Sequence, residues 1–173
     1  LLGALNRLGD TLVDGFEVAD VLHGVTDHVV ELLDADGAGV TMANKQGELE
    51  FVSANTDFAV QLERVQQEHD QGPCHQAFRT GLAVVVDDIS THDEWPVYVE
   101  TAVRVGVRSV IGMPLHVGAR SVGALDVYST RRHSWNHDDL MAARVLANVA
   151  TTYILQALKL EESKILIDQL QAA

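Results

Sequence analysis

Residues 108–129 read RSVIGMPLHVGARSVGALDVYS, and this stretch decides the fold. Two runs of apolar and β-branched residues, Ser109–Val117 and Ser121–Ser129, stand on either side of the short link Gly118-Ala119-Arg120. The pattern predicts two long antiparallel strands joined by a tight turn. Pro114 lies inside the first run and has no backbone N–H to donate, so we expect a bulge or an edge position there.

The rest of the sequence predicts the other strands and the shorter helices. Residues 39–43 and 48–54 enclose the polar turn Asn44-Lys45-Gln46-Gly47, which favours a second hairpin. Hairpin strands with helices grouped around them predict the α+β class with an antiparallel sheet. One more short strand is expected at 83–86, and helices at about 17–33, 56–70, 73–80 and 97–105.

The two ends of the chain predict helices with apolar stripes that need a partner. Residues 1–15 place leucines at steps of four, three and four, which is the spacing of one helix face. From about residue 137 to 171 one long helix is expected, with a partial heptad repeat that Gln156 and Ser163 interrupt. We therefore expect a homodimer through these helices. The predicted interface residues are Leu1, Leu5, Leu8, Leu12, Leu146, Tyr153, Leu160 and Ile167.

The composition narrows the class of partner. The chain has 173 residues and a net charge of −13, which disfavours general binding to nucleic acid or to anionic membranes. No apolar run approaches the ~18 residues of a membrane-spanning helix. The single cysteine, Cys74, excludes an internal disulfide and favours a reducing, cytoplasmic location.

Two stretches resemble a known family. Residues 108–129 are similar to the penultimate hairpin of GAF domains, and residues 72–88 (GPCHQAFRTGLAVVVDD) resemble the short helix and strand before it. The Gly-Pro-Cys opening and the final LEESKILIDQLQAA, residues 160–173, resemble actinobacterial regulators in which a GAF domain precedes an ANTAR domain. The resemblance implies a central antiparallel sheet of five or six strands. Terminal helices would pack on one face, with a ligand-type pocket on the other.

The resemblance also implies a domain division and a function. Residues 1–15 would be an N-terminal helix, 16–158 the GAF sensor domain, and 159–173 the start of a linker helix toward an absent output domain. The sensor would bind a small molecule or mediate dimerisation, and relay a signal to an RNA-binding antitermination domain. RNA would be contacted only through that missing domain. We expect no enzymatic activity, no membrane contact and no metal, and the sequence identifies no cofactor.

The aromatic residues supply the candidates for a ligand pocket. Several fall where the pocket of a GAF domain would lie, with one histidine and one strand carboxylate as polar contacts. Each residue taken singly is better explained as part of the core. The predicted pocket residues are Phe51, Phe58, Phe78, Trp95, Tyr98, His116 and Asp126.

Cys74 is the candidate for redox chemistry. It stands at the start of a predicted helix beside His75, where the helix dipole favours a thiolate. The alternative interpretation is a small buried side chain. The resemblance extends to free methionine-sulfoxide reductases, but these look to several cysteines. A dimerisation scaffold without ligand, a redox or haem sensor using Cys74 or a histidine, and a small enzyme stay open as alternatives.

Overall fold

The computed structural model describes the backbone of residues 18–173, without the side chains of residues 18, 157, 158 and 161. The helix predicted at 1–15, with Leu1, Leu5, Leu8 and Leu12, lies outside the described residues. Within the described part the elements are α2 (Val18–Leu33), β1 (Gly37–Ala43), β2 (Leu49–Ala54), α3 (Asp57–His69), α4 (Pro73–Thr80), β3 (Val84–Val86), the 3-10 turn η1 (Ile89–Thr91), α5 (Pro96–Val105), β4 (Ser109–Val117), β5 (Arg120–Ser129) and α6 (His137–Ala172).

Five strands of the described chain form one antiparallel sheet in the order β2-β1-β5-β4-β3. The predicted central hairpin is β4–β5, in which Ser109 is paired with Ser129 and Val117 with Arg120. Pro114 lies past the end of β3, whose last pairing to β4 is at Gly112, so the missing N–H costs no bond to β3. The expected α+β fold with a GAF-like sheet is confirmed, with five strands.

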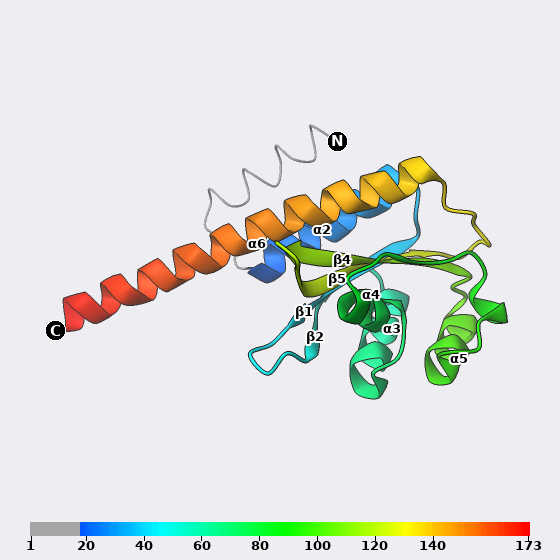
Figure 1. Ribbon diagram of the computed structural model, residues 1–173, viewed down its shortest axis with the longest axis horizontal. Coiled ribbons are helices and arrows are strands. Elements are labelled where there is room, and N and C mark those ends of the chain that lie inside the picture. The colour runs from blue at the N-terminus through cyan, green and yellow to red at the C-terminus, as the bar shows by residue number, and fades with distance from the viewer. Residues whose placement is uncertain (1–17) are drawn as a thin grey trace.

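Helices cover both faces of the sheet, as Figure 1 shows. Helices α2 and α6 lie side by side on one face, and α3, α4 and α5 cover the other. Strand residues alternate between the two layers. In β5, Leu125 and Val127 face α2 and α6, whereas Ala124, Asp126 and Tyr128 face α3 to α5.

Helix α6 begins on the sheet and continues past it. Asn136 and Asp139 form a capping box at its start, with bonds of 2.9 and 3.0 Å. Residues up to Ile154 pack against α2 and the sheet. From residue 155 onward every side chain that the structure describes is exposed, and Figure 1 shows this half extending away from the domain.

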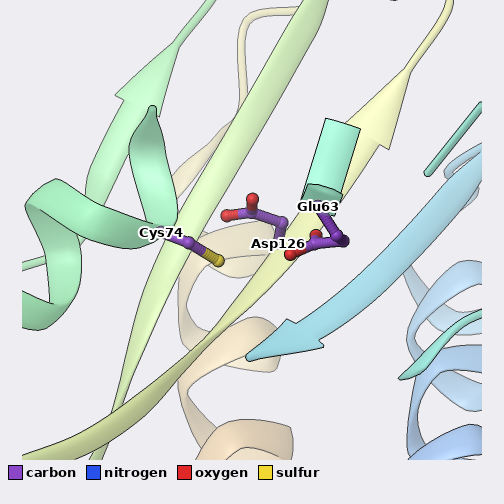
Figure 2. A group of neighbouring side chains, drawn as sticks. All are labelled: Glu63, Cys74 and Asp126. Carbon is purple, nitrogen blue, oxygen red and sulfur yellow. The ribbon is translucent and has the colours of Figure 1, made fainter. Parts of the chain in front are cut away.

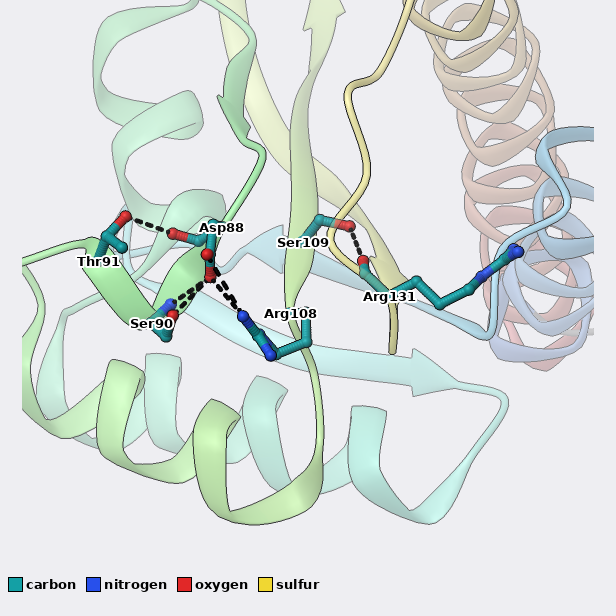
Figure 3. A network of polar contacts seen from close by, with 6 residues as sticks. All are labelled: Asp88, Ser90, Thr91, Arg108, Ser109 and Arg131. Carbon is teal, nitrogen blue, oxygen red and sulfur yellow. Dashed lines mark hydrogen bonds and ion pairs between the residues drawn. The ribbon is translucent and has the colours of Figure 1, made fainter.

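Polar contacts fix the loop between β3 and α5 (Figure 3). Asp88 accepts bonds from the backbone N–H and the hydroxyl of Ser90, at 3.1 and 2.6 Å, and pairs with Arg108 at 3.3 Å. The bonds from Ser90, followed by the charge of Arg108, hold the pKa of the Asp88 carboxyl below its usual value. Nearby, Ser109 donates to the carbonyl of Arg131 at 2.9 Å. Asp88 therefore caps η1 and ties the loop to the start of β4.

No helix in the described residues is long and apolar enough to span a membrane.

Candidate functional site

Three buried side chains meet between the sheet and the helices α3 and α4. Glu63 comes from α3, Cys74 from α4 and Asp126 from β5, and each is 0% exposed. One carboxylate oxygen of each acid and the sulfur of Cys74 lie within 4.8 Å of one another. Figure 2 shows the three side chains converging on a common point. We call this group the acid–thiol cluster.

Glu63 reaches the cluster because α3 turns a mixed face toward the sheet. Its buried residues are Ala59, Leu62, Glu63 and Gln66, which follow the i, i+3, i+4, i+7 spacing of a buried helix stripe. Glu63 packs directly on β1 at Gly39, where an added Cβ would lie 2.7 Å from Cγ and Cδ of Glu63. A residue without a side chain on β1 is thus what makes room for the carboxyl group.

Cys74 is placed by the turn that joins α3 to α4. Gly72 takes a φ of 117°, which a side chain disfavours, and Pro73 opens the helix. The backbone N–H of Cys74 donates to Oε1 of Gln66 at 2.8 Å. The close approach of α4 to the sheet depends on Gly112, where an added Cβ would lie 2.7 Å from the carbonyl oxygen of Pro73.

Asp126 is held by a network of short hydrogen bonds. Its Oδ2 accepts from Nε2 of Gln66 at 2.6 Å and from the hydroxyl of Tyr128 at 2.9 Å. The same hydroxyl lies 2.7 Å from Oε1 of Glu63. A phenol has one proton and can donate to only one of these acceptors. The second short contact therefore requires a proton on one of the two carboxyl groups.

The electrostatics of the cluster follow from its burial. Burial first, and then the charge of Asp126, raises the pKa of Glu63 well above its usual value. Burial also raises the pKa of Asp126 to about 6, opposed by bonds from Cys74, Gln66 and Tyr128. Burial therefore favours keeping one proton shared between the two carboxyl groups.

Four oxygen atoms around the cluster are buried without a hydrogen-bond partner. They are Oε2 of Glu63, Oδ1 of Asp126, and the hydroxyls of Tyr98 and Thr41. Buried polar atoms nearly always have a partner, because losing water without replacement costs about 1–3 kcal/mol each. These oxygen atoms have lone pairs without a hydrogen-bond partner, and they lie in one small region. Such a group of oxygen atoms can bind a cation.

The predicted pocket residues are divided among several places. Tyr98 and Asp126 lie in the buried layer beside the cluster, and Phe58 and Trp95 pack there on Tyr128 and Tyr98, with ring centroids 6.2 and 6.0 Å apart. The other three predicted residues lie toward the surface. Phe78 lines a cavity of about 410 Å³ between β2 and α4, His116 lines one of about 310 Å³ near α6, and Phe51 is half-buried on β2.

Cys74 lies in an environment opposite to that of a reactive thiol. It is completely buried, and burial followed by the negative charges of Asp126 and Glu63 raises its pKa well above the usual value. A reactive cysteine needs the thiolate form and access to its target. The predicted effect of the helix dipole is therefore outweighed by burial and then by the two carboxyl groups.

The predicted interface residues on α6 also divide. Leu146 is 0% exposed in the chain's own core, so it is not available to a second copy, and Tyr153 is half-buried. Leu160 and Ile167 are 62% and 53% exposed. Only the distal half of the predicted seam is open to a partner.

Sequence reasoning did not find Glu63, Gln66 or Tyr128 as site residues. No metal site was predicted, because Glu63, Cys74 and Asp126 are far apart in sequence and share no motif spacing. One signal was present: Glu63 and Gln66 share the face of the predicted helix that carries the apolar Leu62. Acidic or amide residues on such a stripe indicate a buried polar site.

The chain belongs to the GAF domain family, whose model matches residues 17–154. GAF domains are sensory and regulatory signalling domains. A domain of a two-component sensor histidine kinase protein from Sinorhizobium meliloti is similar in structure at 17% identity, with a TM-score of 0.71 over 84% of this chain and 95% of that one. Residues 122 to 287 of a methyl-accepting chemotaxis protein are similar at 20% identity and a TM-score of 0.68, over 91% and 98% of the two chains. No curated protein matches in sequence.

The expectation that this domain has no enzymatic activity is wrong as drawn. A free methionine-R-sulfoxide reductase from Neisseria meningitidis, solved with its substrate, is similar at 20% identity and a TM-score of 0.68, over 90% of this chain and 89% of that one. The same fold thus carries enzymes as well as sensors. Membership of the family does not distinguish an enzyme from a sensor, so the chemistry depends on this chain's own residues.

Proposed function

We propose that this chain is the sensor part of a cytoplasmic regulator. In this proposal, occupation of the face under α3, α4 and α5 changes the packing of α2 and α6, and α6 relays the change to an attached output domain. The resemblance of residues 160–173 to the helix before ANTAR domains favours an RNA-binding antitermination output. The observation that carries the proposal is the distal half of α6.

The distal half of α6 is a helix on whose described side chains no other described segment packs. Its exposed apolar residues would be unfavourable in water if they stayed uncovered. An apolar stripe at heptad spacing is the pattern of a helix that pairs with another helix. The residues exposed by 50% or more are Leu160, Ile165, Leu166, Ile167 and Leu170.

A second copy of the chain is the proposed partner of this helix. Leu160, Ile167 and Leu170 occupy the predicted seam, whereas Ile165 lies on the outer side of the same helix. A continuous helix from the sheet to the dimer seam can transmit a small rotation or shift, because its inner half packs on α2 and β4. The dimer would thus couple the sensor layer to whatever follows α6.

Two substitutions of the same residue type test the dimer. Ile167 and Ile165 are 53% and 52% exposed, so lysine at either position costs the isolated helix about the same. In sedimentation at tens of micromolar we expect wild type and Ile165→Lys to be dimers and Ile167→Lys to be a monomer. A monomeric wild type, or equal behaviour of the two variants, would contradict the proposal.

A dimerisation scaffold without ligand is the second candidate function. It is favoured by Tyr98 and Tyr128, which are completely buried and occupy space between the sheet and the helices. Native mass spectrometry of the purified chain separates the two candidates. A co-purified small molecule or ion supports the sensor, and a bare chain that still dimerises supports the scaffold.

A further inference from the structure

We propose that the acid–thiol cluster binds one divalent transition-metal ion of the zinc or ferrous class, through Glu63, Cys74 and Asp126. The inference deepens the proposed function and rests on it in one respect: the ion would be what occupies the sensor face. The metal site itself is argued from the cluster alone.

The donor atoms are already close to the spacing that a metal requires. Zinc binds carboxylate oxygen at about 2.0–2.2 Å and thiolate sulfur at about 2.3 Å, so the ligand atoms of a tetrahedral site are roughly 3.3–3.8 Å apart. The three donor atoms of the cluster lie within 4.8 Å of one another. A contraction of about 1 Å, within the reach of side-chain rotation, would bring them onto one ion.

Among the described residues, no positively charged side chain balances the negative charge of the acid–thiol cluster. No ion pair among the described residues includes Glu63 or Asp126. Oε2 of Glu63 and Oδ1 of Asp126 are buried and unpartnered, and a shared proton can serve only one of them. A divalent cation bound by the two carboxylates would balance their buried negative charge.

The neighbours of the cluster are arranged as partners of metal ligands usually are. Gln66 donates to Asp126 and accepts from the backbone of Cys74, so it orients two of the three ligands. Tyr128 lies within hydrogen-bond distance of both carboxyl groups. Such outer contacts fix the direction of ligand atoms and raise metal affinity about 10–100-fold.

Tyr98 supplies a fourth polar group. Its hydroxyl is buried, makes no hydrogen bond of normal geometry, and interacts electrostatically with Asp126, Glu63 and Cys74 and with the hydroxyl of Tyr128. A hydroxyl in this position can donate to a metal-bound carboxylate or to a water in the open coordination position. Three protein ligands with one open position is the arrangement of a site that exchanges its fourth ligand.

The donor set selects the kind of metal. Calcium and magnesium take oxygen ligands only and are disfavoured by a thiolate. One sulfur with two carboxylate oxygens suits zinc, ferrous iron and cobalt. On binding, one metal–sulfur bond and two metal–oxygen bonds form, the S–H bond of Cys74 and the O–H bond of the shared proton break, and both protons leave to solvent.

The test uses the full chain, purified without a tag or chelator. Metal content is measured directly, and the chain is then refolded from denaturant with Co²⁺ as the probe, because the site is closed to solvent. We expect one equivalent of metal per chain after gel filtration, and a thiolate-to-cobalt charge-transfer band in the near ultraviolet. Less than a tenth of an equivalent after refolding with excess cobalt would overturn the proposal.

Three variants assign the binding to the cluster. Cys74→Ser should remove the charge-transfer band, and Glu63→Gln, which keeps the shape of the side chain and the fold, should weaken cobalt binding at least tenfold. His23→Gln is the matched control, since it removes an exposed donor pair with Asp27. An unchanged band in Cys74→Ser, or equal loss of binding in His23→Gln, would contradict the assignment.

The outcome is separable from that of the proposed function. Sedimentation of the same samples reports the dimer independently of the metal. A chain that dimerises but takes up no cobalt would contradict the proposed metal site and support the relay through α6. A chain that binds one cobalt ion but stays monomeric would support the metal site and contradict the relay through α6.

Discussion

The two faces of the sheet in this domain are built from alternate residues of the same strands, yet they bury different chemistry. Under α2 and α6 the layer consists mostly of aliphatic side chains, together with Met113 and Trp135. Under α3 to α5 the layer also holds two carboxyl groups, a thiol and two phenols, all completely buried. The first face is what a stable core needs. Burying the polar groups of the second face costs free energy, so the need for a stable core does not explain why they are there.

The buried polar atoms on the two faces also differ in how they are satisfied. On the apolar face, Thr26 and Thr151 donate to carbonyls of their own helices, His23 and Ala147, each at 2.8 Å. On the polar face, four oxygen atoms are left without a partner. The apolar layer also holds an unpartnered atom, Nε1 of Trp135, but the four oxygen atoms of the polar face lie together around the cluster. The two faces therefore differ in chemistry: one is mainly apolar, and the other holds a compact group of buried polar side chains.

The largest expected effect belongs to the apolar face. Leu146→Ala removes a completely buried side chain from the core between α6 and the sheet, and should cost about 2–5 kcal/mol of unfolding free energy. Urea denaturation at a fixed protein concentration measures it. Leu160→Ala on the exposed half of the same helix is the control, expected within about 0.5 kcal/mol when the chain is kept monomeric.

The next effect probes how tightly the polar face is packed. Gly39→Ala places a methyl group against Glu63 and should destabilise the fold by about 1–3 kcal/mol. If the contact with Glu63 is the cause, adding Glu63→Ala should recover part of the loss. A double-mutant cycle by urea denaturation that shows simple additivity would mean that the two residues do not constrain each other.

A smaller effect concerns pH. The raised pKa values of Glu63 and Asp126 mean that the folded protein binds protons more tightly than the unfolded chain. The contribution of Asp126 is complete below its unfolded pKa of about 4 and is lost as pH rises through about 6, and that of Glu63 is lost as pH rises beyond the usual range of a carboxyl group. In chelator, we expect wild type to lose roughly 1–3 kcal/mol between about pH 4 and pH 8 relative to Glu63→Gln.

The difference between wild type and Glu63→Gln separates the titration of the cluster from that of other groups, such as His75, whose pKa is lowered by burial. Parallel pH profiles would show that Glu63 does not titrate abnormally. With bound cobalt the sign should reverse, because metal binding releases protons and tightens as pH rises. Thermal unfolding with and without the metal measures both profiles.

The smallest effect compares one threonine from each face. Thr41→Val removes a buried hydroxyl without a hydrogen-bond partner, and should leave the metal-free fold unchanged or up to about 1 kcal/mol more stable. Thr151→Val removes a hydroxyl bonded to Ala147 and should cost about 1 kcal/mol. Equal effects of the two substitutions in urea denaturation would remove the distinction between the faces.

Much of the fold was predictable because it depends on local patterns. The two apolar runs in residues 109–129 and the uninterrupted helix from residue 137 each depend on neighbours in sequence, and both match the structure. The predicted pocket residues were chosen by type and by approximate position. Only Asp126 and Tyr98 come to lie at the cluster, because side-chain direction on a strand or helix depends on register, which approximate positions do not give.

The sequence by itself determined the class of this protein: an antiparallel sheet with a central β4–β5 hairpin, helices on either side, and a long final helix with an apolar stripe. Periodicity and turn residues are local quantities, so one chain is enough to read them. Only the tertiary structure decided that Glu63, Cys74 and Asp126 meet, that Leu146 belongs to the core, and that Cys74 is closed to solvent. Those outcomes depend on packing between segments distant in sequence, where Gly39 and Gly112 set how near α3 and α4 come to the sheet.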